Sequence, residues 1–199
     1  EELWKTTQSD RLISLAKRLA PLKSKCEKSL RRLVELDQWL TIGRWANSVD
    51  ATMPILCEHG ISIKEGRHLL IDGTPDPVDY GLGKCANKDD RQSIALLTGA
   101  NSGGKTTMLE LLAHCTILAH MGLPVPAKSA KVGRIESLHV LAKAGGTQSA
   151  GALEQTLLQL AEVVSNNNSK LILADELEAI TEPGAGARII AGMLEAAQA

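Results

Sequence analysis

The chain has 199 residues, of which 44% are hydrophobic and 23% are charged, and its formal net charge is −1. There is enough apolar material for a buried core, and the near-zero charge gives no overall attraction to nucleic acid or to a membrane surface. No apolar stretch approaches the roughly 20 residues that span a bilayer. The polar start, EELWKTTQSD, has no Met and no leader pattern, so we expect a piece of a longer protein that is not inserted in a membrane.

The four cysteines are widely spaced, and no C-x-x-C pair or histidine at zinc-ligand spacing accompanies them. We therefore predict that they are reduced and mostly buried, and that they hold no structural metal. They are Cys26, Cys57, Cys85 and Cys115.

Residues 10 to 48 are predicted to be helical, because apolar residues recur at alternating steps of three and four, the spacing of a coiled-coil seam. Pro21 interrupts the pattern, so the seam belongs either to two helices or to one kinked helix. Basic residues crowd this segment. They could follow a phosphate backbone, but the solvated face of a packed helix is the commoner explanation. The seam consists of Leu12, Leu15, Leu19, Leu22, Cys26, Ser29, Leu33, Leu36 and Leu40.

Between Ala51 and Arg91 the sequence becomes rich in Pro, Gly and Asp, with two short β-like runs at 60–64 and 68–72. We predict that these runs are edge strands and that GTPDPVDYGLGK, residues 73–84, is a surface loop. From Gln92 onward strand and helix patterns alternate, which predicts a parallel sheet covered by helices.

Gly99 to Thr106 read GANSGGKT and match the pattern G-x-x-x-x-G-K-[ST]. An apolar run, residues 93–98, predicts a buried strand before them, and a helix is expected to begin near Gly104. This is the context that a phosphate-binding loop requires. Lys105 can neutralise β and γ phosphate oxygens, and the Thr106 hydroxyl can bind Mg²⁺. The alternative is a glycine-rich turn that matches by chance.

In the segment Lys170 to Glu178, KLILADELE, the apolar run Leu171 to Ala174 predicts a second buried strand that ends at Asp175 and Glu176. An acid in this place can hold Mg²⁺ through water, and the next acid can orient or deprotonate an attacking water molecule. The pair could instead be two ordinary carboxylates at a solvated strand end. We predict the catalytic role, with Glu176 as the base and hydrolysis as the favoured reaction.

Five segments resemble MutS-type DNA mismatch-repair ATPases in the same order. LVELDQWLTIGRWA is similar to the end of their lever region, and IKEGRH to the start of their ATPase domain. GANSGGKTT, GLPVPAKSAKVG and DELEAITEPGAGA then stand where the family has its phosphate loop, a GxxVPA segment and DELGRGT.

The resemblance implies an α/β fold of the P-loop NTPase type shared by ABC and MutS ATPases, with a mostly parallel sheet, flanking helices and a helical lever segment before it. The lever end would be residues 1–50, and a C-terminally truncated ATPase domain would be residues 51–199. Ser149, in GGTQSAGALEQT, corresponds by order to a serine that reaches the γ-phosphate held by a partner subunit. It could equally cap a helix.

The implied ligands are ATP and Mg²⁺, with Glu176 and Lys105 as catalytic residues and Thr106 and Asp175 at the metal. The implied partners are a second copy or a related subunit and mismatched or branched DNA, bound mainly through regions outside these residues, with no membrane partner. A cytoplasmic, nucleoid-associated location follows. The expected ATP-binding residues are Gly99, Ala100, Asn101, Ser102, Gly103, Gly104, Lys105, Thr106, Thr107, Asn87 and, from the partner, Ser149.

Two departures from the repair enzymes stand out. The family's adenine-stacking aromatic residue is replaced by Lys84-Cys85-Ala86-Asn87, and the chain has no Phe. The stem of Lys84 could cover the base, and Asn87 could contact it. EAITEPGAGA resembles divergent, archaeal-type MutS relatives more than it resembles GRGTST. The alternatives are an ABC-type ATPase of another class, for transport or chromosome structure, whose serine usually lies in an LSGG-like string unlike TQSAG, and a nucleotide-gated scaffold without turnover.

Overall fold

The computed structural model describes residues 2–73, 75–86, 93–99, 103–141 and 168–175, together with 161, 163, 191, 192 and 195. The chain divides into two compact units, Glu1–Trp45 and Ala46–Ala199. Each unit is described by itself below.

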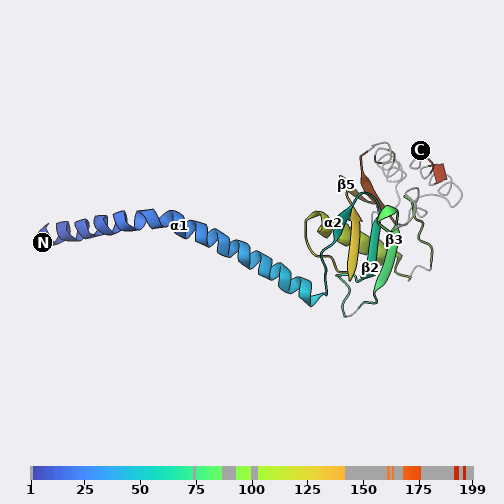
Figure 1. Cartoon of the computed structure of the whole chain (residues 1–199), viewed down its shortest axis with the longest axis horizontal. Helices are drawn as coiled ribbons and strands as arrows, with labels where there is room; N and C mark the ends of the chain where they lie inside the picture. Colours follow the sequence, from blue (N-terminus) through green and yellow to red (C-terminus); the bar gives the residue numbers. More distant parts are fainter. Residues whose placement is uncertain are drawn as a thin grey trace, which may run out of the picture. The chain divides into compact units, whose positions relative to one another are not determined.

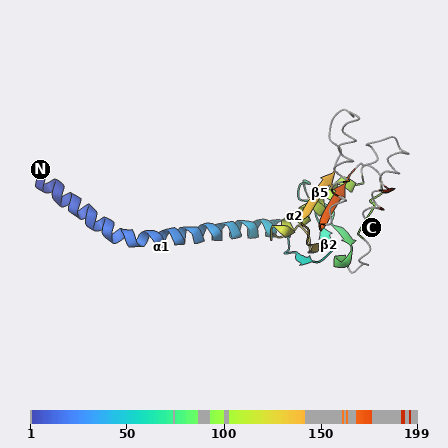
Figure 2. The same cartoon turned by 90° about the horizontal axis from the view of Figure 1, so that it is seen from above.

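The first unit consists of residues of one long helix, α1 (Glu2–Ser48), which has 47 residues and ends three residues beyond the unit (Figure 1). The helix predicted for residues 10–48 is confirmed, and it is one helix with Pro21 inside it. Proline lacks the N–H that would donate to the preceding turn, and this is the usual cause of a bend within a helix. Figure 2 shows α1 bent in its blue, N-terminal half, which agrees with the kinked alternative.

The second unit contains a mixed four-stranded sheet with the order β1-β4-β2-β3. Strand β1 (Ile55–Cys57) runs parallel to β4 (Ser129–Gly133), whereas β2 (Ile61–Gly66) is antiparallel to both β4 and β3 (Val78–Leu82). A short 3-10 helix, η1 (Lys84–Ala86), follows β3. A smaller parallel sheet joins β5 (Ser137–Leu141) to β6 (Lys170–Ala174) in the register Leu141 opposite Ala174.

Helix α2 (Lys105–His120) packs its apolar face into a core that both sheets share. Because the burial of apolar side chains is the main favourable term in folding, this core fixes where the N-terminus of α2 lies. Within the described ranges, no helix has both the length and the apolar character needed to cross a membrane. The core includes Ile61, Ile63, Ala130, Val132, Leu111, Leu112, Cys115, Ala119 and, from β6, Leu173.

The sequence-based strand assignments need four corrections. The run at 60–64 is a strand, β2, but it lies inside the sheet and not at its edge. Residues 68–72 form a turn, and the loop predicted for 73–84 contains β3, an edge strand whose outer side needs no apolar pattern. Residues 93–98 are not a strand: they pair with no strand in the described chain, and the Leu96 side chain is 79% exposed.

The mostly parallel sheet is also not what the described residues show, because β2 is antiparallel to both of its neighbours. Only the β1–β4 and β5–β6 pairs are parallel. The strand predicted for Leu171 to Ala174 is confirmed as β6, which begins one residue earlier, and the helix expected from near Gly104 is confirmed as α2.

The prediction that all four cysteines are reduced is wrong for two of them. Cys57, at the end of β1, is disulfide-bonded to Cys85 of η1, and their Cα atoms are 6.2 Å apart. That separation lies within the range that a disulfide spans. The sequence pattern could not show it, because the fold brings together residues 28 positions apart. Cys26 is free and exposed, and Cys115 is free and buried.

Candidate functional site

The loop before α2 depends on a glycine at its last position. Gly104 is the N-terminal cap of α2 and has φ 75°, the left-handed conformation that glycine adopts without strain. A Cβ at this position would meet no atom within 4 Å, so the requirement is one of backbone conformation and not of space. The Gly104 carbonyl accepts the first helical hydrogen bond, from Met108 N–H at 2.9 Å. The N–H groups of the first turn of α2 therefore point toward the N-terminal end of the helix, which Gly104 caps.

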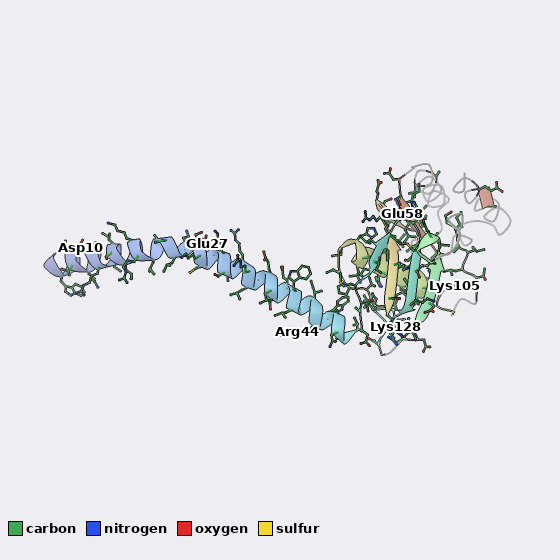
Figure 3. The ribbon with its side chains drawn as sticks, viewed as in Figure 1. Asp10, Glu27, Arg44, Glu58, Lys105 and Lys128 are labelled. Carbon is green, nitrogen blue, oxygen red and sulfur yellow. A yellow bond between two sulfur atoms is a disulfide. The ribbon has the colours of Figure 1, made fainter. Side chains whose placement is uncertain are left out.

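The Lys105 side chain contacts the first residue of the same motif. Its ammonium group donates a hydrogen bond of 2.6 Å to the Gly99 carbonyl, so the first and seventh residues of the motif are joined. Figure 3 shows Lys105 at the surface of the unit. A positive charge at a helix N-terminus, beside backbone N–H groups, is an arrangement that attracts an anion.

Thr106, in the first turn of α2, contacts Asp175, which follows β6. The Thr106 hydroxyl donates to Asp175 Oδ2 at 2.5 Å, although the two residues are 69 positions apart. Asp175 is held by its backbone, because its N–H donates to the Leu141 carbonyl at 2.8 Å and so extends the β5–β6 ladder by one residue. The first turn of α2 and the carboxyl end of β6 therefore form one site.

The oxygen atoms at this junction suit a hard divalent cation. A threonine hydroxyl and an aspartate carboxylate are the kinds of ligand that Mg²⁺ takes, alongside water and phosphate oxygens. Thr106 and Asp175 are the residues that would hold Mg²⁺ here, and their adjacency fits that role.

Several predicted site residues lie outside the described residues, and nothing is stated of their placement. They are Asn87, Ala100, Asn101, Ser102, Ser149 and Glu176. Gly103 is described and exposed, and Thr107 lies half-buried in the first turn of α2.

The structure gives Lys84 a different contact from the one considered in the sequence. Its ammonium group lies 2.7 Å from Glu58 Oε2, in an exposed ion pair at the end of β1. Hydrogen bonding to Lys84 lowers the pKa of the Glu58 carboxyl below its ordinary value. The charged end of Lys84 is thus engaged with the protein.

The sequence did not predict one side-chain hydrogen bond that involves α2. His68 Nδ1 accepts from Leu70 N–H at 3.2 Å, so Nε2 carries the proton and donates to Glu110 Oε2 at 2.9 Å. His68 follows β2 and Glu110 lies on α2, so this hydrogen bond ties the sheet to the helix that bears the loop. The Arg-His pair in IKEGRH marked His68 in the sequence. Nothing in the sequence indicated that its partner would be Glu110, 42 positions away.

An α/β unit with a glycine loop at a helix N-terminus and an aspartate at the neighbouring strand end defines a class of anion-binding domain. The model for the family described as MutS domain V matches residues 95–198, which is more than half of the chain. The chain therefore belongs to the MutS family.

Curated relatives extend the similarity into the first unit. The chain is similar to the DNA-binding protein MutS2 of Pyrococcus furiosus, with 39% identity over 183 residues, covering 90% of this chain and 32% of that protein. It is similar to the endonuclease MutS2 of Halalkalibacterium halodurans, with 34% identity over 173 residues, covering 82% of this chain and 21% of the relative. The putative endonuclease MutS2 of Bacillus subtilis shows 35% identity over 178 residues, covering 83% and 21%. The chain thus spans between a fifth and a third of the length of these relatives.

Proposed function

We propose that this chain is the ATP-binding and ATP-hydrolysing part of a MutS-type protein. ATP binds with Mg²⁺ at Gly99 to Thr107, and Glu176 directs water onto the γ-phosphate. A second subunit closes over the nucleotide with Ser149. Closure of this dimer is coupled to the binding of mismatched or branched DNA by other parts of the protein.

The observation that carries the proposal is the contact between Thr106 and Asp175. A chance glycine-rich turn has no reason to lie against the carboxylate at the end of a distant strand. A site for a magnesium-bound polyphosphate needs both groups, because the hydroxyl and the carboxylate share one ion. The glycine loop precedes the acid in the chain, and this is also the order in the MutS-type ATPases that the sequence resembles.

Charge supports the same assignment. The ammonium of Lys105 lies 2.6 Å from the carbonyl of Gly99, the first residue of the glycine motif, and a cation there can neutralise β and γ phosphate oxygens. When bound, Mg²⁺ would neutralise phosphate charge as bond cleavage proceeds. Lys105 would exchange its contact with Gly99 for one with phosphate, and Glu176 would accept the proton of the attacking water.

Dimer closure and DNA coupling rest on the family and not on contacts within this chain. One relative carries "DNA-binding protein" in its name. ATP that contacts two subunits favours the closed dimer by mass action, and hydrolysis removes that contact. The basic helix α1 would pass the change toward DNA-binding parts. Membership of the MutS family favours this proposal over an ABC-type ATPase of another class.

The test is phosphate release by the full-length protein that contains this chain, with and without branched or mismatched DNA. Lys105→Ala is expected to abolish nucleotide binding or turnover. Lys128→Ala is the matched control, because Lys128 pairs with Glu65 at 2.6 Å and lies at a separate position on the same unit (Figure 3). Unchanged steady-state hydrolysis in Lys105→Ala would refute the site.

Two further variants separate metal binding from catalysis. Asp175→Asn should raise the Mg²⁺ concentration needed for half-maximal turnover by roughly tenfold or more, since removing even an indirect metal partner costs that much. Glu176→Gln should retain ATP binding in calorimetry and lose phosphate release. If the unaltered protein binds ATP without releasing phosphate, it is a nucleotide-gated scaffold and not an ATPase.

A further inference from the structure

A cavity of about 180 Å³ lies in the second unit, where the four-stranded sheet meets the start of β6. Ile61, at the start of β2, and Val132, near the end of β4, line it from the sheet, and Leu171 lines it from β6. Thr116 of α2 also lines it, but its hydroxyl is already donated to the Leu112 carbonyl at 2.7 Å. The body of the cavity is therefore mainly apolar.

The cavity is separate from the proposed nucleotide site. Strand β6 begins beside the cavity with Lys170 and is followed by Asp175, and five residues of strand span roughly 16 Å. Thr116 comes ten residues after Thr106 on α2, which corresponds to about 15 Å of helix. Two elements thus place the cavity at a distance from the contact between Thr106 and Asp175.

The charges around the cavity favour an anion. Arg134, which follows β4, and Lys170 both line it, and the Lys170 ammonium donates to the Val163 carbonyl at 2.5 Å. Glu58, which Figure 3 shows at the surface of the unit, also lines the cavity, but Lys84 pairs with it at 2.7 Å. The Arg134 guanidinium is in no ion pair within the described residues, so it is the cation best able to bind a ligand.

The backbone around the cavity is held in place by several contacts. Gly133 N–H donates to the Gly60 carbonyl at 2.7 Å, and a Cβ at Gly133 would lie 2.8 Å from that same oxygen, so the turn after β1 rests directly on β4. Arg134 N–H donates to the carbonyl of Cys57, which is itself disulfide-bonded, and the Arg134 carbonyl accepts from the Ser169 hydroxyl at 2.8 Å. A site whose walls are held in this way loses little conformational freedom when a ligand binds.

The volume limits the size of the ligand. A cavity of roughly 150 Å³ holds one molecule of benzene, whereas sites for drug-sized ligands have roughly 300–1,000 Å³. A cavity of about 180 Å³ therefore fits one six-membered ring with a substituent of a few atoms, and it is too small to enclose a nucleoside triphosphate.

We propose that this cavity binds a small organic anion that consists of one ring and a carboxylate. The ring lies against Ile61, Val132 and Leu171, and the carboxylate lies on the Arg134 guanidinium. A guanidinium binds a carboxylate through two parallel N–H···O bonds, which favours such an anion over a neutral molecule of the same shape. The proposal does not depend on the nucleotide site.

The test uses para-fluorobenzoate as the probe and para-fluorobenzamide as its neutral control of nearly the same shape. Fluorine NMR of each probe would be recorded at pH 7.5 during titration with the full-length protein that contains this chain. We expect the benzamide to bind roughly tenfold more weakly than the benzoate, because hydrogen bonds to a charged group are stronger than those between neutral groups.

Two variants assign the binding to the cavity. Arg134→Gln should weaken benzoate binding about tenfold and change benzamide binding by less than about twofold, since it removes the charge and keeps the apolar wall. Lys131→Gln is the matched control, because Lys131 is an exposed cation of β4 that does not line the cavity, and it should change neither affinity. Leu171→Phe adds volume inside the cavity and should weaken both probes, with circular dichroism to verify that the variant is folded.

Four results would overturn the proposal. Absence of benzoate binding at millimolar concentration would show that the cavity takes no such ligand, and equal affinity for the two probes would show that charge selects nothing. Unchanged benzoate binding in Arg134→Gln would place the probe elsewhere on the protein. Displacement of the benzoate by Mg-ATP would make the cavity part of the nucleotide site, whereas failure of ATP to bind at all would leave the benzoate result unaffected.

Discussion

The half-buried imidazole of His114, on α2, is a poorly satisfied polar group of the second unit. Its Nδ1 is buried and has no hydrogen-bond partner among the described residues, and its ring centroid lies 5.2 Å from that of His68. Burial lowers the pKa of His114 below its ordinary value, and nearby His68 lowers it further, whereas Glu110 opposes the shift. The fold therefore disfavours the protonated form of His114.

We predict that His114→Leu stabilises the protein by about 1 kcal/mol at pH 7.5, since a buried polar group without a partner costs roughly that much or more. The gain should increase toward pH 5. Below the unfolded pKa, near 6.5, the unfolded chain binds a proton at His114 that the folded chain resists, so the unaltered protein loses stability as the pH falls and the variant lacks this loss.

Urea unfolding at several pH values would measure both effects. Exposed His59 provides the control, because His59→Gln removes an imidazole that the core does not bury. A variant at position 114 whose stability falls with acid as steeply as that of the unaltered protein would contradict the assignment.

At the scale of single residues, the sequence predicted what depends on local pattern. Lys105, Thr106 and Asp175 could be selected because a glycine loop precedes a helix and an acid follows an apolar run. The hydrogen bond between His68 and Glu110 and the bond between Cys57 and Cys85 could not, because each joins residues that only the tertiary fold brings together.

At the scale of elements, the position of α2 depends on a glycine in β2. A Cβ at Gly66 would lie 2.6 Å from Ile63 Cγ2 and 3.1 Å from Leu111 Cδ2, so the side of α2 that bears Leu111 rests almost directly on the strand. The pairing of β2 with β3 shifts register between Ile63 and Gly66, which indicates a bulge at this point.

We predict that Gly66→Ala destabilises the second unit by about 1 to 3 kcal/mol, the usual cost of overpacking a core, and displaces the N-terminal end of α2. Gly43→Ala is the matched control. A Cβ at Gly43 meets no atom within 4 Å, and alanine in a helix is more stable than glycine by roughly 0.5–1 kcal/mol. Thermal unfolding followed by circular dichroism would compare the two, and a Gly66→Ala variant as stable as the unaltered protein would show that α2 does not need this close approach.

Elements were predicted well where periodicity is strong and long. Helices α1 and α2 and strand β6 were predicted close to where they lie, because each has a sustained apolar pattern. Strand β3 was missed because its exposed, Gly- and Asp-containing sequence has the composition of a loop. The run at 93–98 has the composition of a buried strand, but a strand also requires a ladder partner, which composition does not reveal.

At the scale of the whole molecule, a disulfide, an ion pair and a backbone hydrogen bond join the end of β1 to the segment that follows β3. Cys57 is the last residue of the edge strand β1, and Cys85 lies in η1, which follows the opposite edge strand β3, so the disulfide joins segments from both edges. The exposed ion pair between Glu58 and Lys84 lies beside it, and Cys85 N–H donates to the His59 carbonyl at 3.0 Å. Strand β1 has only three residues, so its hydrogen bonds to β4 alone would hold it weakly. These additional contacts keep β1 in place.

We therefore predict that protein purified without reductant has two reactive thiols after unfolding, and four after reduction. Closing a loop of 28 residues restricts the unfolded chain, so reduction should lower the free energy of unfolding of the second unit by about 3 to 4 kcal/mol. The Cys57→Ala, Cys85→Ala variant should be less stable without reductant and insensitive to it, whereas Cys26→Ser, at the exposed thiol of α1, should behave like the unaltered protein. Four reactive thiols in the unreduced, unfolded chain would show that the two cysteines are adjacent but unbonded, and the closure of the sheet would then depend on the ion pair and the backbone hydrogen bond alone.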